Sequence, residues 1–290
     1  MLADLHTHSS RSDGTTTPTE LVTAAKAAGL DVVALTDHDT ADGWAEAAEA
    51  AARVGITLVR GMELSTKYDG HSVHLLAYLP DPTYPPLVAE LARINDGRTE
   101  RMPTMVRNLQ LAGHAITAED VLAVSSEGAV LGRPHVADAL VRNGVVASRD
   151  EAFATLLGPG GVGYVRRYGA PLQPTIDLVR EAGGVAVIAH PRGRGLGLAD
   201  DAIAELSRHS LTGIEVDHQG HSPQDRAELR ALAADLGLVA TGSSDYHGAG
   251  KVDHELGCNT TAPEQLERLL DAAERSRLAS GRPAPAVLPA

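Results

Sequence analysis

The chain has 290 residues, of which 43% are hydrophobic and 3% aromatic, and its formal net charge is −13. The apolar content is enough for one substantial core and excludes a disordered chain, while the acidic balance argues against a broad surface that tracks a nucleic-acid backbone. One cysteine, Cys258, excludes an internal disulfide framework and fits a reducing compartment. Because the sequence shows neither a signal-type leader nor an apolar run of roughly 20 residues, we expect a cytoplasmic protein without a membrane partner.

The first 81 residues are predicted to alternate strands with helices. An Asp13-Gly14 turn leads into a capping box at Thr17 and Glu20, and Gly29 is a good stop for the helix that follows. Short apolar runs bounded by turn residues predict the strands. In chain order we expect a strand at 2–6, the helix up to Gly29, a strand at 31–36, a helix at about 41–53, and strands at 56–59 and 71–78.

The pattern changes at residue 82 and changes back at residue 169. Between these points helical segments follow one another without a clear apolar strand, which predicts an inserted helical lobe over 82–168 that covers the active site. Its expected helices are 85–111, 118–124, 134–143 and 149–156. From 169 to 280 we expect strands at 185–189, 213–217 and 238–241 among helices at 174–182, 199–209, 222–236 and 263–273. The Pro- and Ala-rich residues 281–290 are expected to form a flexible tail.

Polar side chains gather where the predicted strands end. His6 and His8 occupy alternate positions at the end of the first strand, so both can reach one ion. His74 is the exception, because it lies within its strand. The other members of the set are His38, Glu63, His190, Asp245 and His247. Ligands bind at this end of α/β barrels and sheets, and imidazoles with carboxylates bind divalent metals, so the distribution predicts a metal centre rather than scattered core histidines.

These residues carry a resemblance to a known family. The chain resembles the PHP (polymerase and histidinol phosphatase) phosphoesterases over nearly its whole length. The motifs that carry the resemblance are Asp4-x-His6-x-His8, Asp13, Thr36-Asp37-His38, Glu63, His74, His190-Pro191 and Gly242-Ser243-Ser244-Asp245-Tyr246-His247. The resemblance implies an α/β fold of the distorted (β/α)7 barrel type, with which the seven predicted strands agree. It also implies a centre of two or three divalent metal ions, for which Mn, Fe and Zn are all suitable.

The resemblance further implies which residues bind these metals. His6, His8, Glu63 and Asp245 would hold one ion, Glu63 would bridge to a second ion held by His74 and His190, and Asp13, His38 and His247 would hold a third. Metals a few Å apart lower the pKa of a bridging water and supply hydroxide for an in-line attack on phosphorus. The residues expected to act in catalysis are Asp13, His38, Glu63, His190, Asp245 and His247. Asp37 and Asp39 flank His38 and are either acceptors for the ligand imidazoles or solvated loop acids.

Substrate recognition is expected to involve the insertion and cations near the metal ligands. Arg133 and His135, in the run Gly132-Arg133-Pro134-His135, are candidates for binding substrate. Arg133 precedes a predicted helix, where a guanidinium and a helix N-terminus can both bind phosphate. The alternative is that Arg133 is a surface residue and His135 a neighbour of the helix cap. The run resembles one in nucleotide-acting PHP members. Further candidates for binding substrate, each equally open to being only solvated, are Arg192, Arg194, His218 and Lys251.

The expected function is therefore hydrolysis of phosphomonoesters. The insertion resembles that of the nucleoside 3′,5′-bisphosphate and AMP phosphatases, a subgroup that includes a member that trims RNA 5′ ends, so the expected partner is a small phosphorylated nucleotide or a short 5′-phosphorylated oligonucleotide. One alternative is a histidinol-phosphate phosphatase, for which Glu215 and Asp217 are candidate acceptors of the substrate amine. The other alternative is a non-catalytic accessory PHP module that only binds metal. The oligomeric state has no readable signature in the sequence.

Overall fold

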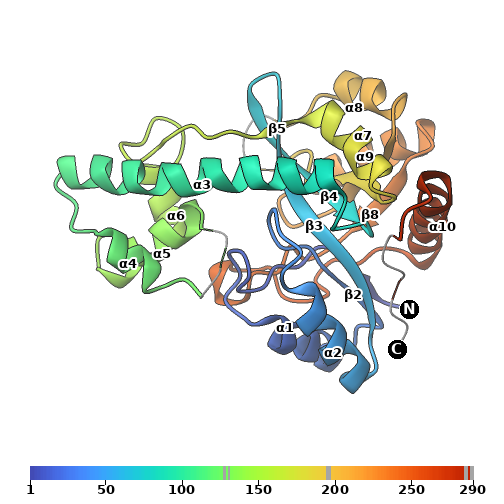
Figure 1. Ribbon diagram of the computed structural model, residues 1–290, viewed down its shortest axis with the longest axis horizontal. Coiled ribbons are helices and arrows are strands. Elements are labelled where there is room, and N and C mark those ends of the chain that lie inside the picture. Colours follow the sequence, from blue (N-terminus) through green and yellow to red (C-terminus); the bar gives the residue numbers. More distant parts are fainter. Residues whose placement is uncertain (127–128, 130, 194–196, 284–286, 288–290) are drawn as a thin grey trace.

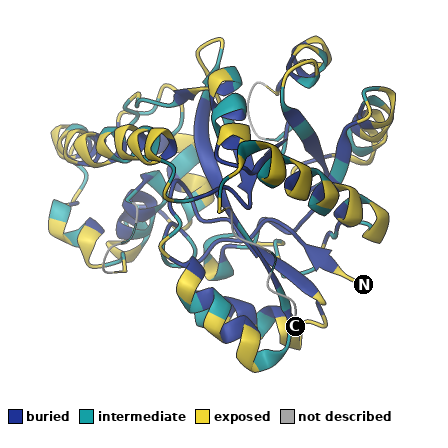
Figure 2. Ribbon diagram, turned by 45° about the vertical axis from the view of Figure 1, so that its right-hand side comes forward, coloured by how far each residue is buried: buried dark blue, intermediate teal, exposed yellow. Residues whose placement is uncertain are grey.

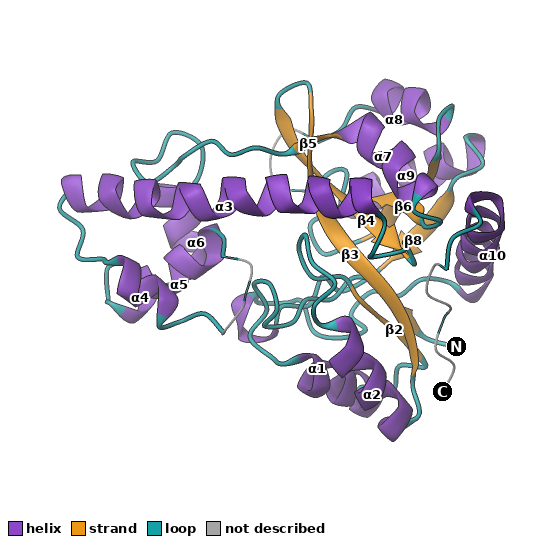
Figure 3. Cartoon of the chain, viewed as in Figure 1, coloured by secondary structure: helices purple, strands orange, loops and turns teal. Residues whose placement is uncertain are grey.

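One mixed sheet forms the centre of the molecule. The computed structural model describes residues 1–126, 129, 131–193, 197–283 and 287. The strands are β1 (Ala3–Asp4), β2 (Val32–Leu35), β3 (Thr57–Tyr68), β4 (His71–Tyr78), β5 (Ala170–Pro171), β6 (Val185–Ile188), β7 (Leu211–Asp217) and β8 (Val239–Gly242). Seven of them follow the order β1-β2-β3-β4-β6-β7-β8. Figure 3 shows the long strand β3 crossing the middle of the molecule, with helices around the sheet. Isolated bridges between Ala3 and Thr261 and between Thr7 and Tyr246 join the two ends of this order, so the strands form a nearly closed barrel.

Helices cover the outside of the barrel. They are α1 (Pro18–Ala27), α2 (Trp44–Val54), α7 (Leu172–Glu181), α8 (Asp200–Ser207), α9 (Pro223–Asp235) and α10 (Pro263–Ser280). Most strand residues are buried, whereas the helices around them have exposed outer faces (Figure 2). The predicted capping box of α1 is present, since the Thr17 hydroxyl accepts from the backbone of Glu20 and the Glu20 carboxylate accepts from the backbone of Thr17. In the described part of the chain no helix is long and apolar enough to cross a membrane.

Strand β3 differs most from its prediction. It was expected over 56–59 and instead continues to Tyr68, because it changes partner: it pairs in parallel with β2 up to Arg60 and antiparallel with β4 from Gly61 onward. Glu63 was expected at the end of a strand, and this was wrong, since the residue lies inside β3. It lies, however, just beyond the point where the parallel pairing stops. The hairpin with β4 therefore carries Glu63 and His74 on one continuous ribbon.

The other differences are smaller. The short strand β5 was not anticipated and pairs with the far end of β3 at Thr66 and Lys67. Helix α10 continues to Ser280 rather than ending near residue 273. The extent of both segments depends on partners from distant parts of the chain, because β5 pairs with β3 and α10 packs against β6, β7 and β8.

The predicted helical insertion is present between β4 and β5. It consists of α3 (Pro85–Leu111), α4 (Ala118–Leu122), α5 (Arg133–Arg142), α6 (Arg149–Ala152) and a π-helical turn, η1 (Phe153–Leu157). Helix α3 projects well beyond the barrel, and α4, α5 and α6 lie under its far half (Figure 1). These helices share an apolar core of their own, which includes Met105, Leu109 and Leu140. The domain limits at 81/82 and 168/169 stay a prediction, and most of the expected tail over 281–290 lies outside the described residues.

Candidate metal centre

The first group of candidate ligands lies where β1 runs out into a loop. His6 and His8 are both fully buried, and their Nε2 atoms lie 3.0 Å apart. Oε2 of Glu63 lies 3.2 Å from Nε2 of His6 and 3.1 Å from Nε2 of His8. Oδ1 of Asp245 lies 3.5 Å from each of the same nitrogens. Two imidazole nitrogens and two carboxylate oxygens thus converge on one point.

This donor set fits a cation. Nδ1 of His6 lies 3.2 Å from the buried Glu215 carboxylate, which accepts a hydrogen bond from Nδ1–H and leaves Nε2, the atom that faces Glu63 and Asp245, as the nitrogen that can bind a metal. Lone pairs of nitrogen and carboxylate oxygen repel one another unless a positive charge lies between them. The geometry of the group is therefore that expected of a site for a divalent metal.

The second group surrounds the other oxygen of Glu63. Its Oε1 atom lies 2.8 Å from Nδ1 of His74 and 3.2 Å from Nε2 of His190. His38 lies between the two groups, with Nδ1 3.2 Å from Oε2 of Glu63, the oxygen that also faces His6 and His8. Glu63 therefore has one oxygen directed to each of two groups of imidazoles, which is the arrangement expected of a bridging carboxylate.

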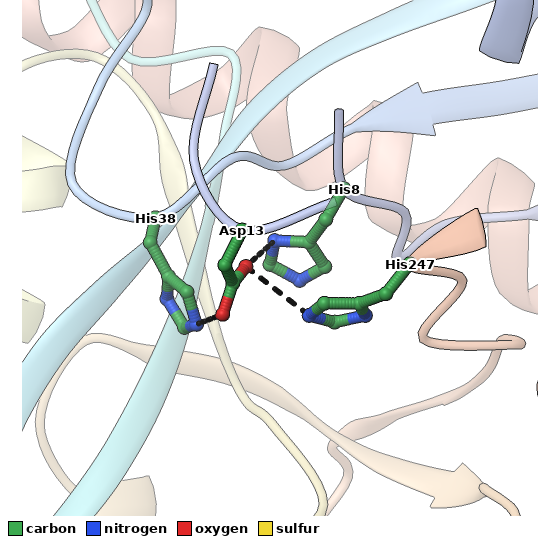
Figure 4. A group of neighbouring side chains, drawn as sticks. All are labelled: His8, Asp13, His38 and His247. Carbon is green, nitrogen blue, oxygen red and sulfur yellow. Dashed lines mark ion pairs between the residues drawn. The ribbon is translucent and has the colours of Figure 1, made fainter. Parts of the chain in front are cut away.

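The third group is centred on Asp13. Its Oδ1 atom lies 3.2 Å from Nε2 of His247 and 3.7 Å from Nδ1 of His8, and its Oδ2 atom lies 3.8 Å from Nε2 of His38 (Figure 4). All four side chains are buried. Gly14 makes this possible, because a Cβ atom there would lie 2.3 Å from the backbone oxygen of His8 and would push the Asp13 loop away. All nine residues that the sequence predicts as ligands thus lie in three adjoining groups, which is consistent with a multinuclear metal site.

The charged side chains of these groups shift one another's pKa values. Burial alone would raise the pKa of Glu63, but His38, His74 and His6 outweigh it and hold that pKa well below its usual range. Burial lowers the pKa of His38 to about 3 and that of His247, with help from Lys251, to about 4. Their imidazoles are therefore neutral near pH 7, which is the form that binds metal.

Backbone strain marks the same region. Three residues beside or within the groups have positive φ without being glycine, namely Asp39 at 55°, His190 at 29° and Asp245 at 53°. Such conformations cost on the order of 1–3 kcal/mol each and cluster at functional sites, where the surrounding structure imposes them. The loops after β2, β6 and β8 are thus bent to direct these side chains inward.

Buried acids hold the loops that carry the ligands. Asp37 accepts from the backbone and hydroxyl of Ser9 and from Ser12, whose hydroxyl lies 3.4 Å from Nδ1 of His8. Asp39 is not a solvated acid either, since it is buried and ion-paired with Arg98. Neither acid is recorded as a hydrogen-bond partner of the His38 ring.

Glu215 was missed as a support for the centre. Besides its contact with His6, its Oε2 atom accepts from the backbone N–H of His190 at 2.7 Å, and Ser243 donates to its Oε1 atom. It lies in the second half of β7, and its side chain is fully buried beside His6. A sequence signal existed, because an acid within an apolar strand is rarely buried without a partner.

The proposed substrate residues divide into two sets. Arg133, His218 and Lys251 line a cavity of about 980 Å³ that also includes residues of the metal centre. His135 is not part of the cavity wall, since its Nδ1 accepts from the backbone of Gly132 and so caps α5. Arg192 is also absent from the wall and is ion-paired with Asp200. Arg194 lies outside the described residues.

Two of the proposed substrate residues, Lys251 and His218, contact the Asp245 carboxylate. Lys251 donates to Oδ2 of Asp245, and Nε2 of His218 lies 3.2 Å from the same oxygen. Since the backbone N–H of Gly220 donates to Nδ1 of His218, the remaining nitrogen carries the proton and donates to Asp245. His254 completes a fourth group with His218 and Asp245, which the sequence did not suggest.

Three arginines of the insertion that were not anticipated also line the cavity. Arg98 and Arg101 come from α3 and Arg167 from the segment before β5, and they join Arg133 in lining the space. A signal was available for the first two, because residues three apart on a helix lie on the same face. The lining of the cavity thus combines imidazoles and carboxylates of the candidate metal centre with guanidinium groups of the insertion.

Comparisons with known proteins agree with this geometry. Residues 4–143 match the family model described as the PHP domain. The chain is 37% identical over 262 residues to the 3′,5′-nucleoside bisphosphate phosphatase of Chromobacterium violaceum. The alignment covers 90% of this chain and 92% of that enzyme. It is 35% identical over 246 residues to the 5′-3′ exoribonuclease of Haemophilus influenzae, covering 84% of this chain and 89% of that enzyme.

A solved structure extends the likeness to three dimensions. A candidate metal-dependent phosphoesterase of Bifidobacterium adolescentis superposes with a TM-score of 0.90 at 38% identity, over 93% of this chain and 96% of that one. The shared fold and the sequence identities over nearly the full length have one explanation. The chain belongs to the PHP-domain family and is a metal-dependent phosphoesterase.

Proposed function

We propose that this enzyme hydrolyses phosphomonoesters of nucleotides, with a nucleoside 3′,5′-bisphosphate or the 5′ end of a short RNA as substrate. The observation that carries the proposal is the cavity of about 980 Å³ between the candidate metal ligands and the arginines of the insertion. A volume in the range of 300–1,000 Å³ is typical of sites for molecules of nucleotide size. The relatives from Chromobacterium violaceum and Haemophilus influenzae, whose names specify a nucleoside bisphosphate and RNA, support the same class of substrate.

The groups of the proposed centre would bind two or three divalent ions through the nine residues already described. Such ions activate water and neutralise phosphate oxygens, and Mn, Fe and Zn all suit a mixed set of imidazoles and carboxylates. The chain itself supplies the orientation: Glu215 holds His6, Asp37 and Ser12 hold the loop of His8, and His218 holds Asp245. For catalysis we assign direct roles to Asp13, His38, Glu63, His190, Asp245 and His247.

Arg133 is proposed to bind substrate phosphate from the insertion side. Its guanidinium lies over the rings of Phe153 and Tyr164, at 5.3 and 5.8 Å from their centroids. The only hydrogen bond recorded for it in the described structure goes to the backbone oxygen of Leu157 at 3.3 Å. The ring contacts fix the plane of the guanidinium, and most of its donors are left for a ligand.

Histidinol phosphate is the weaker alternative. Its amine would need an acceptor in the cavity, and the two candidates named from the sequence do not provide one. Glu215 is fully buried and holds His6, and Asp217 is ion-paired with Arg230; neither lines the cavity. An arginine-rich lining is also a poor surface for an ammonium group.

The test is a comparison of substrates on one metal-loaded preparation. We expect kcat/KM for adenosine 3′,5′-bisphosphate or a short 5′-phosphorylated RNA to exceed that for histidinol phosphate at least tenfold. A tenfold preference for histidinol phosphate would overturn the substrate assignment. Metal binding without turnover of these esters or of p-nitrophenyl phosphate would instead indicate the accessory module that only binds metal.

A further inference from the structure

Three cations of the insertion line the cavity and have no ion pair with any carboxylate of the described residues. Arg101, Arg133 and Arg167 all line it, and no ion pair is recorded for them within the described part of the chain. The other cations of the cavity wall behave differently. Arg98 pairs with Asp39, Arg149 with Asp138, and Lys251 with Asp245.

Arg101 is the clearest case. Its side chain is only 6% exposed, its Nε atom is buried without a hydrogen-bond partner, and the described residues provide no acceptor for the rest of its guanidinium. A buried charged donor without an acceptor is unfavourable and is rare in folded proteins. Such a group is retained where a molecule outside the chain supplies the acceptor.

The side chains of Arg167 and Arg133 are held in place by neutral groups, and no carboxylate of the described residues neutralises their charge. Nη2 of Arg167 donates to the Ser65 hydroxyl at 2.8 Å, while its Nη1 atom is buried without a partner. Arg133 is held by the two aromatic rings and one backbone oxygen. Each guanidinium therefore has a fixed position and unused N–H groups.

The three charges also act on one another. Burial, followed by Arg133 and Arg98, lowers the pKa of Arg101 to about 9. Burial, followed by Arg98, lowers the pKa of Arg167 to about 9, although Asp39 opposes the shift. Like charges held together in a buried place are unfavourable until an anion binds between them.

We propose that Arg101, Arg133 and Arg167 form a binding site for a substrate phosphate other than the one that is cleaved. The proposal rests on the proposed function and names the feature that selects its substrate. The metal ligands and this arginine triad line the same cavity, so a molecule with two separated phosphates can occupy both. A phosphate offers several charged oxygen acceptors to guanidinium donors, which bind it with charge-assisted hydrogen bonds.

The test compares Arg101→Met with Arg107→Met in the metal-loaded protein. Methionine retains much of the side-chain volume and removes the charge, and Arg107 is an exposed residue of the same helix outside the cavity wall. The quantity measured is the ratio of kcat/KM for adenosine 3′,5′-bisphosphate to that for p-nitrophenyl phosphate. We expect Arg101→Met to lower this ratio about 30- to 150-fold, the loss of one charged hydrogen-bonding group, and Arg107→Met to leave it within about threefold. An unchanged ratio in Arg101→Met would overturn the site.

A second measurement separates this proposal from the function on which it rests. If the wild-type protein does not hydrolyse the bisphosphate, the proposed function fails. The affinity for inorganic sulfate then tests separately whether the three arginines bind an anion. Isothermal titration of the metal-loaded proteins is expected to give about tenfold weaker sulfate binding for Arg101→Met than for Arg107→Met. Equal affinities in the two variants would show that the triad binds no anion.

Discussion

Arg149 of the insertion forms a two-pronged ion pair with Asp138, with Nε and Nη2 each 2.5 Å from a different carboxylate oxygen. The same guanidinium reaches the barrel, since its Nη1 atom donates to the backbone oxygens of Asp13 at 3.2 Å and Gly250 at 3.3 Å. One side chain thus connects α5 and α6 to the two loops that carry the third group of candidate ligands.

Replacing Arg149 by Lys is expected to loosen this connection. A lysine cannot make the two parallel bonds to Asp138 and also reach both loops, so we expect kcat/KM for nucleotide substrates to fall about 10- to 100-fold, equivalent to about 1.5–3 kcal/mol. Arg142→Lys, at an exposed position of α5, is the matched control. Faster hydrogen exchange over residues 149–157 in the Arg149 variant alone would report the loosening directly. Wild-type kinetics and wild-type exchange would show that the contact is not needed.

Removal of a candidate ligand is expected to remove metal. His6→Ala and Asp245→Ala each withdraw a donor atom from the first group, so both variants should lose metal and most of their activity. His71→Ala is the control, because His71 is exposed at the start of β4 and belongs to none of the groups. Metal analysis by mass spectrometry, together with turnover of p-nitrophenyl phosphate, checks both effects. Full metal content in both variants would refute the assignment of the centre.

Metal affinity is expected to depend on pH through His8. Burial lowers the pKa of this imidazole, but Asp245 and Glu63 outweigh burial and raise it to about 9 in the metal-free protein. Below pH 9 a proton on His8 must leave before the nitrogen can bind metal. His6 loses a second proton, because burial lowers its pKa but Glu63 and Asp245 raise it well above its usual value, so the apparent affinity should rise at least tenfold per pH unit between 7 and 9. His38 should contribute nothing in this range, because its pKa lies near 3. Titration against a competing chelator measures the slope, and a flat profile between pH 7 and 9 would contradict the prediction.

The candidate ligands could be predicted because each follows a local pattern. His6, His8, His38, His190 and His247 all come shortly after an apolar run, and the ends of parallel strands meet at one face of a barrel. The helix α3 was predicted with its observed limits over 85–111 because its first turn contains proline and no strand signal interrupts it.

The remaining features depend on contacts between distant segments. Glu63 lies inside β3 because the strand changes its partner at Gly61, and the residues 56–68 alone do not encode that change. Arg101 was overlooked because an arginine on an amphipathic helix is normally solvated. Its burial follows from how α3 lies over the cavity, which no local pattern predicts.

The same burial predicts that Arg101 reduces the stability of the ligand-free protein. An unpartnered guanidinium that is 6% exposed loses its hydration and gains no acceptor in the described structure, a cost of about 1–3 kcal/mol. Arg101→Met removes this cost and places an apolar chain beside Met105 and the apolar core of the insertion, so Tm without substrate should rise by about 2–6 °C. Arg107→Met should leave Tm within about 1 °C, because an exposed side chain keeps its hydration in both states. Calorimetry on the metal-loaded proteins measures Tm. A lower Tm for Arg101→Met would mean that the guanidinium stabilises the ligand-free fold, which would contradict the prediction.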